Sequence, residues 1–172
     1  MRNNKIWIIC IALAISIMSI SCVKNDVVEE EEYTAEKEQE LLNTYLDYLI
    51  EEGYDIDTTA NGVYYVVLTE GDGTTPQYGD EVSATYDGYF IGGAVFDTSG
   101  DPALYGYFKY KHRVDEMIDG WEEGIETIKK GGKSLLIVPS KLAYGEYGYY
   151  SILPYTTLLF EIYVHDIVSP EE

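Results

Sequence analysis

The stretch Gly120-Trp121-Glu122-Glu123-Gly124 lies at the centre of the chain's aromatic-rich half and decides the fold. Around it, Ile118, Trp121, Ile125 and Ile128 recur at spacings of three and four, which places them on one face of a helix. A run this short, bounded by glycines, predicts a short helix rather than a long one. We therefore expect a rigid element that turns the Trp121 indole inward.

Both ends of this helix have recognisable signals. Asp119 is expected to cap the N-terminus, where Glu122 three residues later also suits the positive end of the helix dipole. Lys129-Lys130 and then Gly131-Gly132 predict its end. The residues from Phe96 to Phe160 are interpreted as the walls of one apolar pocket that encloses the indole.

Residues 1–21 have the pattern of an export signal. Arg2 and Lys5 form a basic start, and the apolar run from Ile6 to Met18 is short for a membrane span but suits a secretory signal peptide. Cys22 follows a small residue directly, which resembles a bacterial lipoprotein cleavage box and predicts lipidation of Cys22 and a membrane anchor there. An ordinary signal peptide followed by an unmodified cysteine is the alternative.

Composition limits the function classes. Cys10 lies within the signal, so the exported part keeps Cys22 alone and cannot form a disulfide framework. Loss of the two basic residues takes the formal charge from −20 to −22, and so acidic a surface repels nucleic acid. The 151 residues left after removing residues 1–21 suffice for one domain with a substantial core.

An acidic tether precedes the folded part. Residues 22–40 form this tether, with eight carboxylates and one lysine between Asp26 and Glu40, a charge block that favours an extended spacer. A helical pattern runs from about Thr34 to Glu52, and residues 41–60 are assigned to an N-terminal helix and linker. Its apolar stripe comprises Leu42, Tyr45, Leu46, Leu49 and Ile50. Because one amphipathic helix is unstable alone, it should pack on its own domain or, less favoured, on a second chain.

The remainder alternates strand-like segments with turns. The expected strands are residues 63–69, 81–91, 94–97, 133–138 and 157–165. The last is the clearest, since Leu158, Phe160, Ile162 and Val164 alternate with polar residues. Strands, one short helix and strands again predict an antiparallel α+β domain whose sheet wraps a helix, over residues 61–168, with residues 169–172 as a tail.

These segments carry a set of motifs in a characteristic order. The motifs are Gly71-Asp72-Gly73, Tyr86, Phe96-Asp97-Thr98-Ser99, Ile118, Gly120-Trp121-Glu122-Glu123-Gly124, Pro139, Ala143-Tyr144-Gly145 and Leu158-Leu159-Phe160-Glu161. In order and spacing the chain from Gly62 to Val168 resembles the FKBP-type peptidyl-prolyl cis-trans isomerases, and with the lipoprotein box it is similar to their exported lipoprotein branch. The resemblance implies a bent antiparallel sheet of five to six strands wrapped round the short helix, with the N-terminal amphipathic helix added.

The resemblance also implies which residues form the site. Those expected to act in catalysis are Tyr86, Phe96, Asp97, Ile118, Trp121, Tyr144 and Phe160. Those expected to bind substrate around them are Phe108, Tyr110, Met117, Tyr149, Ile152 and Leu153. In such domains the Ile118 N–H and the Tyr144 hydroxyl bond substrate carbonyls, and Asp97 bonds the Tyr86 hydroxyl while it faces the prolyl amide.

The chemistry suits an apolar pocket. Rotation of an X-Pro bond costs about 18–20 kcal/mol because amide resonance is lost. The twisted amide is less dipolar than the planar one, so a pocket that excludes water favours the twisted form. No metal, nucleophile or cofactor is needed, and no metal-ligand spacing is present: His112 and His165 are isolated and expected to be exposed.

Three functions stay open at this point. The first is a monomeric, lipid-anchored isomerase of a bacterial envelope, on the outer membrane and facing periplasm or surface, that acts on proline-containing polypeptides. The second is a weakly catalytic or non-catalytic holdase that uses a tyrosine-rich rim, Tyr147, Tyr149, Tyr150 and Tyr155. The third is a glycan binder, which only the abundance of tyrosine supports. The loop 146–157 departs from the family pattern by lacking its proline-rich pair and by being one residue shorter, so the sequence leaves substrate preference and turnover open.

Overall fold

The computed structural model describes residues 33–170. The predicted signal peptide, the lipidation site Cys22 and the tether as far as Glu32 lie outside the described residues. The helices and strands are α2 (Ala35–Glu51), β1 (Asp57–Thr58), β2 (Tyr64–Thr69), β3 (Glu81–Phe90), β4 (Val95–Thr98), α3 (Pro102–Tyr105), β5 (Phe108–Lys111), α4 (Asp119–Ile125), β6 (Lys133–Val138), the 3-10 helix η2 (Ser140–Leu142) and β7 (Leu158–Val168).

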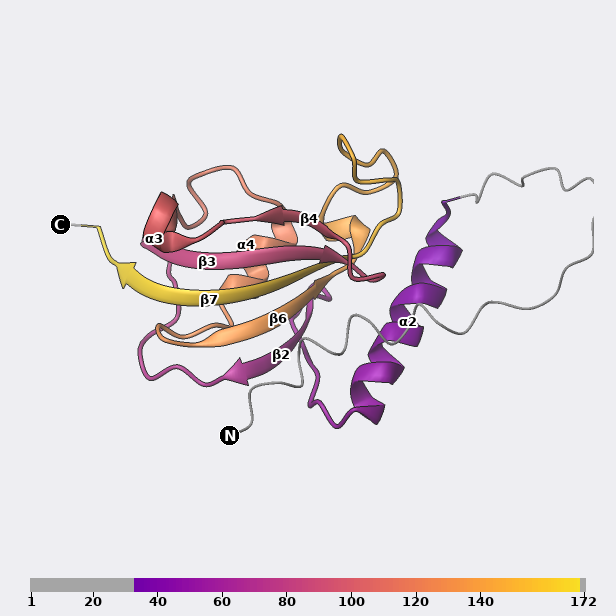
Figure 1. Cartoon of the computed structure of the whole chain (residues 1–172), viewed down its shortest axis with the longest axis horizontal. Helices are drawn as coiled ribbons and strands as arrows, with labels where there is room; N and C mark the ends of the chain where they lie inside the picture. Colours follow the sequence, from indigo (N-terminus) through magenta and orange to yellow (C-terminus); the bar gives the residue numbers. More distant parts are fainter. Residues whose placement is uncertain (1–32, 171–172) are drawn as a thin grey trace, which may run out of the picture.

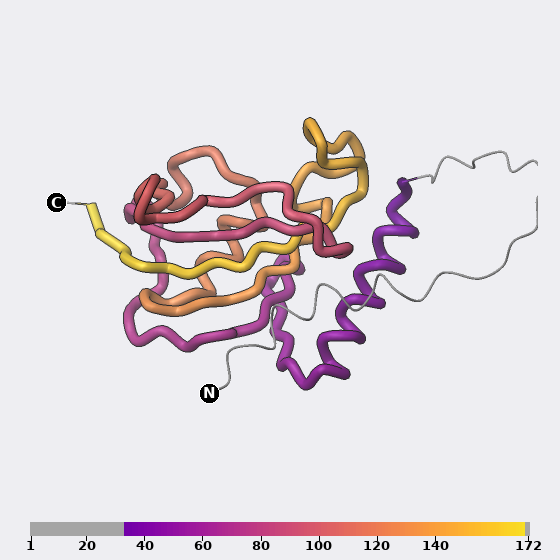
Figure 2. The backbone as a smooth tube through the Cα atoms, viewed as in Figure 1, coloured from indigo at the N-terminus to yellow at the C-terminus, as the bar shows by residue number. Residues whose placement is uncertain are grey.

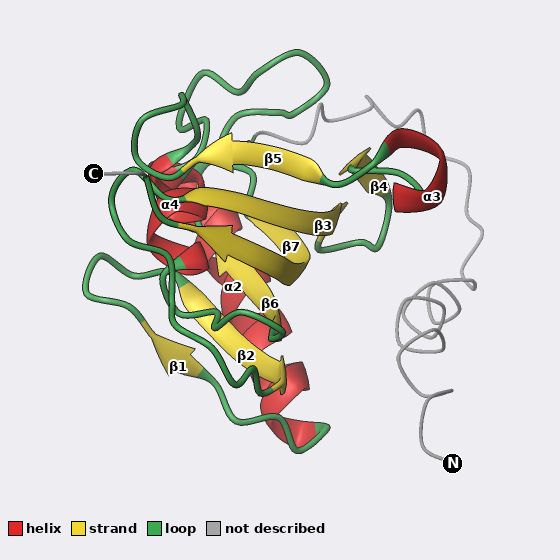
Figure 3. Ribbon diagram, turned by 90° about the vertical axis from the view of Figure 1, so that its left-hand side faces the viewer, coloured by secondary structure: helices red, strands yellow, loops and turns green. Residues whose placement is uncertain are grey.

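One antiparallel sheet organises the described residues (Figure 1). Its strands lie in the order β1-β2-β6-β7-β3-β4, and β5 also pairs with β3. β4 and β5 occupy different parts of the same edge of β3, residues 87–89 and 81–84 respectively, and α3 lies between them in the chain (Figure 3). The α+β class is confirmed, but the sheet described here has seven strands rather than five to six, because the two-residue β1 and the short β5 were absent from the predicted strands.

Helix α4 lies against one face of this sheet. The alternating residues Leu158, Phe160, Ile162 and Val164 of β7 face it, as predicted, and the Trp121 side chain is only 1% exposed. Burial of this apolar surface is the main term that stabilises the domain.

The glycines of the Gly120–Gly124 stretch let α4 approach β6 closely. A Cβ at Gly120 would lie 2.2 Å from a Val138 methyl, and a Cβ at Gly124 would lie 2.3 Å from a Leu136 methyl. Both contacts are shorter than any van der Waals separation, so a side chain at either position would push the helix off the sheet.

Two details of the predicted helix are wrong. Its N-cap is Ile118, which makes no side-chain capping bond, and Asp119 is the first helical residue. The helix also ends at Ile125, so Lys129-Lys130 lie beyond it, although Ile128 still belongs to the same core. The first turn keeps its acidic residues near the positive end of the helix dipole.

Helix α2 covers the opposite face of the sheet. Leu42 and Leu49, each 3% exposed, pack with Val66, Ile137 and Leu159, which point away from α4. The helix therefore packs on its own domain, as the favoured alternative predicted. It begins at Ala35, inside the stretch assigned to the tether.

The two helices leave the sheet covered on both faces. The tube in Figure 2 shows the N-terminal end of α2 beside the loop between η2 and β7. Between residues 33 and 170, none of the helices combines the length and apolar character that a membrane span requires.

Candidate active site

The indole of Trp121 lies at the centre of a group of perpendicular rings. Its ring centroid is 5.0 Å from that of Tyr86, 5.4 Å from Phe160 and 5.9 Å from Phe108, with interplanar angles of 77°, 87° and 86°. Edge-to-face packing of this kind is favoured by the ring quadrupoles. Four rings from β3, β5, α4 and β7 thus meet above the short helix.

Two further rings extend the group. Tyr110 of β5 lies 6.2 Å from Trp121, and Phe96 of β4 lies 5.5 Å from Phe160 at 82°. We refer to the six rings Tyr86, Phe96, Phe108, Tyr110, Trp121 and Phe160 as the aromatic cluster. The structure brings together all six of these predicted site residues, and three of them, Tyr86, Phe96 and Phe108, are only partly buried.

One polar pair lies at the edge of the aromatic cluster. The Tyr86 hydroxyl donates to Oδ2 of Asp97 at 2.8 Å, and the Thr98 N–H donates to Oδ1 at 2.8 Å. Burial, together with the hydrogen bond and charge of Asp97, raises the pKa of Tyr86 well above its usual value, so the hydroxyl stays a neutral donor. These bonds hold both oxygens of an exposed carboxylate beside the rings.

The N-terminus of α4 presents a backbone donor. Ile118 has an extended backbone, with φ −67° and ψ 145°, and it packs with Met117 against the aromatic cluster. Its carbonyl accepts from the N–H groups of Trp121 and Glu122, whereas its own N–H has no acceptor within residues 33–170. A carbonyl group entering beside the indole could accept this hydrogen bond.

The loop between η2 and β7 covers the site. Tyr144 stacks on Tyr149, with ring centroids 4.9 Å apart and a 10° angle, and burial raises the pKa of Tyr144. Ile152, only 7% exposed, inserts into the core beside the aromatic cluster. Leu153 is 46% exposed and faces a groove against α2, and Tyr149 is 53% exposed and stacks on Tyr144, so these two predicted substrate-binding residues do not pack with the aromatic cluster.

The expectation that His112 is exposed is wrong. Its side chain is 0% exposed, with Nδ1 2.6 Å from Oε2 of Glu122 and Nε2 2.9 Å from Oε1 of Glu126. The Arg113 N–H and Nε also donate to these two carboxylates. His165 is partly buried on the other face of the sheet, where its ring lies 2.9 Å from the Thr85 hydroxyl oxygen.

The sequence contains a signal for the buried contact between His112 and the carboxylates of α4. Phe108, Tyr110 and His112 alternate, which predicts that they share one strand face, and Glu122 and Glu126 are four residues apart on the helix side. Tyr110 links the two features, since its hydroxyl lies 3.4 Å from His112 Nδ1 and its ring contacts Trp121. The group formed by His112, Glu122 and Glu126 therefore lies next to the aromatic cluster, in contact with Tyr110.

In the described part of the chain, His, Cys, Asp and Glu nowhere form a group of three placed to hold a metal.

Comparison with known proteins identifies relatives. Residues 72–165, more than half of the chain, match the family model described as FKBP-type peptidyl-prolyl cis-trans isomerase. The isomerase FkpA of Escherichia coli K12 is 38% identical over 115 residues, which are 65% of this chain and 40% of FkpA. The isomerase Mip of Coxiella burnetii is 37% identical over 111 residues, which are 62% of this chain and 45% of Mip. The chain thus spans less than half the length of these relatives.

Solved structures agree with this fold. The crystal structure of Escherichia coli FkpA superposes with a TM-score of 0.67 and 33% identity, covering 78% of this chain and 61% of that one. A peptidyl-prolyl cis-trans isomerase from Pseudomonas syringae superposes with a TM-score of 0.62 and 27% identity, covering 76% of this chain and 96% of that one. Both similarities extend beyond the residues that the family model matches.

Proposed function

We propose that this chain, which belongs to the FKBP-type peptidyl-prolyl cis-trans isomerase family, accelerates rotation about X-Pro bonds in exported polypeptides. The observation that carries the proposal is the aromatic cluster itself, with the Tyr86–Asp97 hydrogen bond at its edge. An apolar surface of this kind suits a proline ring, and it leaves the carbonyl oxygens of the substrate to a small number of polar groups.

The mechanism follows from how the amide changes as it rotates. The planar amide is strongly dipolar and water stabilises it, whereas the twisted amide has lost resonance and is less dipolar. Placing the X-Pro bond against the aromatic cluster removes water and so favours the twisted form. Each tenfold acceleration requires only about 1.4 kcal/mol of such preference.

Polar groups then fix the orientation of the substrate. In this proposal the Ile118 N–H donates to one substrate carbonyl and the Tyr144 hydroxyl donates to another. Asp97, held by the Tyr86 hydroxyl, faces the prolyl amide in the same proposal. Met117, Ile152 and the remaining rings surround the proline.

The cellular setting belongs to the same proposal. The signal pattern of residues 1–21 and the box at Cys22 support an envelope protein anchored by lipid in a bacterial membrane, on the outer membrane and facing periplasm or surface. Packing of the apolar face of α2 on its own sheet supports a monomer. Light scattering on the purified chain measures its oligomeric state directly.

A second function is favoured by one observation. On the loop that covers the site, Tyr147 is 86% exposed, Tyr149 53% and Tyr150 93%. Exposed tyrosines give large contact areas at low entropic cost, so this rim could hold unfolded chains without catalysis.

Phe96→Ala and Tyr147→Ala separate the two functions. The Phe96 ring packs 5.5 Å from Phe160 and 5.2 Å from Phe90, and it is only partly buried, so the variant should stay folded. We expect Phe96→Ala to lower kcat/KM on X-Pro peptides about tenfold, which corresponds to about 1.4 kcal/mol. Tyr147→Ala, as the matched control on the rim, should leave peptide turnover within about twofold of wild type.

The same proteins are then assayed on a protein whose refolding is limited by proline isomerisation. Acceleration by wild type and loss in Phe96→Ala support the isomerase. If wild type accelerates neither peptides nor refolding but still suppresses aggregation of an unfolded protein, the isomerase proposal is wrong and the holdase remains.

A further inference from the structure

Helix α2 contacts the loop that covers the aromatic cluster through one carboxylate. Glu38 accepts the Ser140 N–H at 2.6 Å and the Thr157 hydroxyl at 2.8 Å on Oε1, and the Ser140 hydroxyl at 2.5 Å on Oε2. The two partners are 102 and 119 residues away along the chain. Three hydrogen bonds that converge on one carboxyl group make a directional contact.

The partners of Glu38 mark the two ends of the loop. Ser140 begins η2, from which the chain leaves the sheet, and Thr157 directly precedes β7, where the chain returns. Ser140 is 4% exposed and Thr157 is 3% exposed, so neither can replace Glu38 by bulk water. The segment between them carries Tyr144, Tyr149 and Ile152, which are expected to contact the substrate.

A groove of about 270 Å³ lies beside this contact. It is lined by Tyr33 and Leu41 on the helix side and by Leu153 and Tyr155 on the loop side. Within the loop, the Tyr155 N–H donates to the Gly145 carbonyl at 2.9 Å. The loop is thus closed on itself by its own backbone, and its base is fixed to α2 at Glu38.

We propose that Glu38 is a positioning residue that sets the substrate loop over the aromatic cluster, so that α2 is part of the working site and not only a spacer. Residues 72–165, which match the family model, include Ser140 and Thr157 but not Glu38. The inference rests on the proposed isomerase function for its kinetic test, and a second readout is independent of activity.

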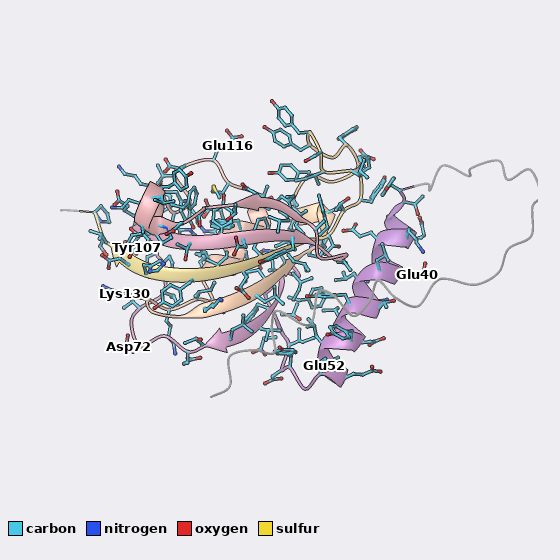
Figure 4. The ribbon with its side chains drawn as sticks, in the orientation of Figure 1. Glu40, Glu52, Asp72, Tyr107, Glu116 and Lys130 are labelled. Carbon is cyan, nitrogen blue, oxygen red and sulfur yellow. The ribbon has the colours of Figure 1, made fainter. Side chains whose placement is uncertain are left out.

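Four variants of the full chain test the proposal. Glu38→Ala removes all three hydrogen bonds. Glu38→Gln keeps them, because its amide oxygen can accept the Ser140 N–H and the Thr157 hydroxyl while its amide nitrogen donates to the Ser140 hydroxyl oxygen. Thr157→Val removes one bond and keeps the side-chain shape. Glu40→Ala is the control, since Glu40 lies on the side of α2 turned away from the sheet and, among residues 33–170, its carboxylate pairs with Lys37 alone at 3.0 Å (Figure 4).

The first readout is native-state cleavage of the loop by chymotrypsin, for which the exposed Tyr147 and Tyr150 are substrates. We expect cleavage there to be about fivefold faster in Glu38→Ala and unchanged in Glu38→Gln and Glu40→Ala. The second readout is turnover on a panel of X-Pro peptides. We expect the KM of Glu38→Ala to rise about fivefold, with a changed order of preference for X, while kcat stays within about twofold.

The outcomes are decisive in both directions. Faster loop cleavage with a raised KM in Glu38→Ala, partial effects in Thr157→Val and recovery in Glu38→Gln support the proposal. Cleavage and KM that equal those of Glu40→Ala overturn it. Equal changes in cleavage and KM in Glu38→Ala and Glu38→Gln also overturn it, because the three hydrogen bonds would then not explain the effect. Accelerated cleavage over the whole chain with a lower Tm overturns it too, because α2 would then act only on global stability. If wild type proves inactive, the proposed function fails while the cleavage pattern still decides the role of Glu38.

Discussion

Replacement of His112 by alanine should strongly destabilise the fold. The imidazole is fully buried, and each of its ring nitrogens lies within 2.9 Å of a different carboxylate of α4, Glu122 or Glu126. Both ring nitrogens are thus engaged with carboxylate oxygens of the same helix. His112 therefore fixes α4, and with it the floor of the aromatic cluster, to the end of β5.

The size of the effect depends mainly on Glu122. This residue is 7% exposed, and without the imidazole its carboxylate keeps, within the described part of the chain, only the Arg113 N–H, at 3.1 and 3.2 Å from its two oxygens. Removing one partner of a buried ion pair typically costs about 3–5 kcal/mol. The Glu126 side chain is 39% exposed, so water screens the loss there and its contribution is small.

Thermal unfolding followed by circular dichroism at pH 7 measures this loss. For a chain of this size Tm changes by roughly 2–4 °C per kcal/mol, so His112→Ala should lower Tm by roughly 6–20 °C. His165→Ala is the matched control, because that ring is partly exposed on the other face of the sheet and pairs with the Thr85 hydroxyl. It should lower Tm by less than about 4 °C.

A double variant separates the lost polar contact from the lost volume. His112→Leu combined with Glu122→Leu removes both members of the pair, and replacing a buried pair by apolar residues is often neutral or stabilising. We expect the double variant to be more stable than His112→Ala by about 2 kcal/mol or more. If His112→Ala unfolds within 1 °C of His165→Ala, or if the double variant is the least stable of the three, the reasoning about a buried charge pair is refuted.

Two further expectations concern pH and anchoring. Burial acts to raise the pKa of Glu126, but hydrogen bonds from Arg113 and His112 outweigh it and hold this pKa below its ordinary value of 4.5. A carboxylate whose pKa is depressed in the folded state stabilises the fold above about pH 4.5, and this contribution is lost as the pH falls. The free energy of unfolding measured with urea should therefore decrease from about pH 6 to about pH 3, and it should decrease less in Glu126→Gln. An equal decrease in both proteins would contradict this. For the anchor, labelled palmitate should be incorporated into the wild-type chain expressed in bacteria and not into Cys22→Ser, and equal labelling of both would rule out lipidation at Cys22.

The residues around Trp121 show what local pattern predicts well. Spacings of three and four placed Trp121 and Ile125 on one helix face, and strict alternation placed Phe160 and Ile162 on one strand face. Both periods are fixed by backbone geometry, so they hold whatever the tertiary contacts are. The order of the motifs carried the family resemblance, which in turn implied that the sheet wraps round the short helix.

The missed strand β5 shows where local pattern becomes ambiguous. In Phe108–Lys111 two aromatic residues alternate with two lysines, and four residues are too few to distinguish a strand from a loop by periodicity. Without that strand, His112 had no assigned direction and was expected in water. Once β5 pairs with residues 81–84 of β3, the same alternation directs His112 inward to the carboxylates of α4.

Glu38 marks a harder limit. In the sequence it is one of eight carboxylates between Asp26 and Glu40, and nothing in its neighbourhood distinguishes it from Glu36 or Glu40. Its role depends on two hydroxyls more than 100 residues away, brought to it only after α2 packs through Leu42 and Leu49 on the back of the sheet. Apolar packing sets the position of the helix to within a turn, and the three hydrogen bonds then select one carboxylate.

The two faces of the sheet contribute different parts of the proposed site. In the proposed mechanism the aromatic cluster on the α4 face supplies the apolar surface that favours a twisted amide, and all of its residues lie within residues 72–165. On the α2 face a residue outside that range holds the base of the loop that closes over the cluster. If the proposal holds, two chains with the same aromatic cluster can differ in substrate preference through their N-terminal helices. This difference should be sought in KM rather than in kcat, because in the proposal the loop contacts the substrate without altering the surface on which the bond rotates.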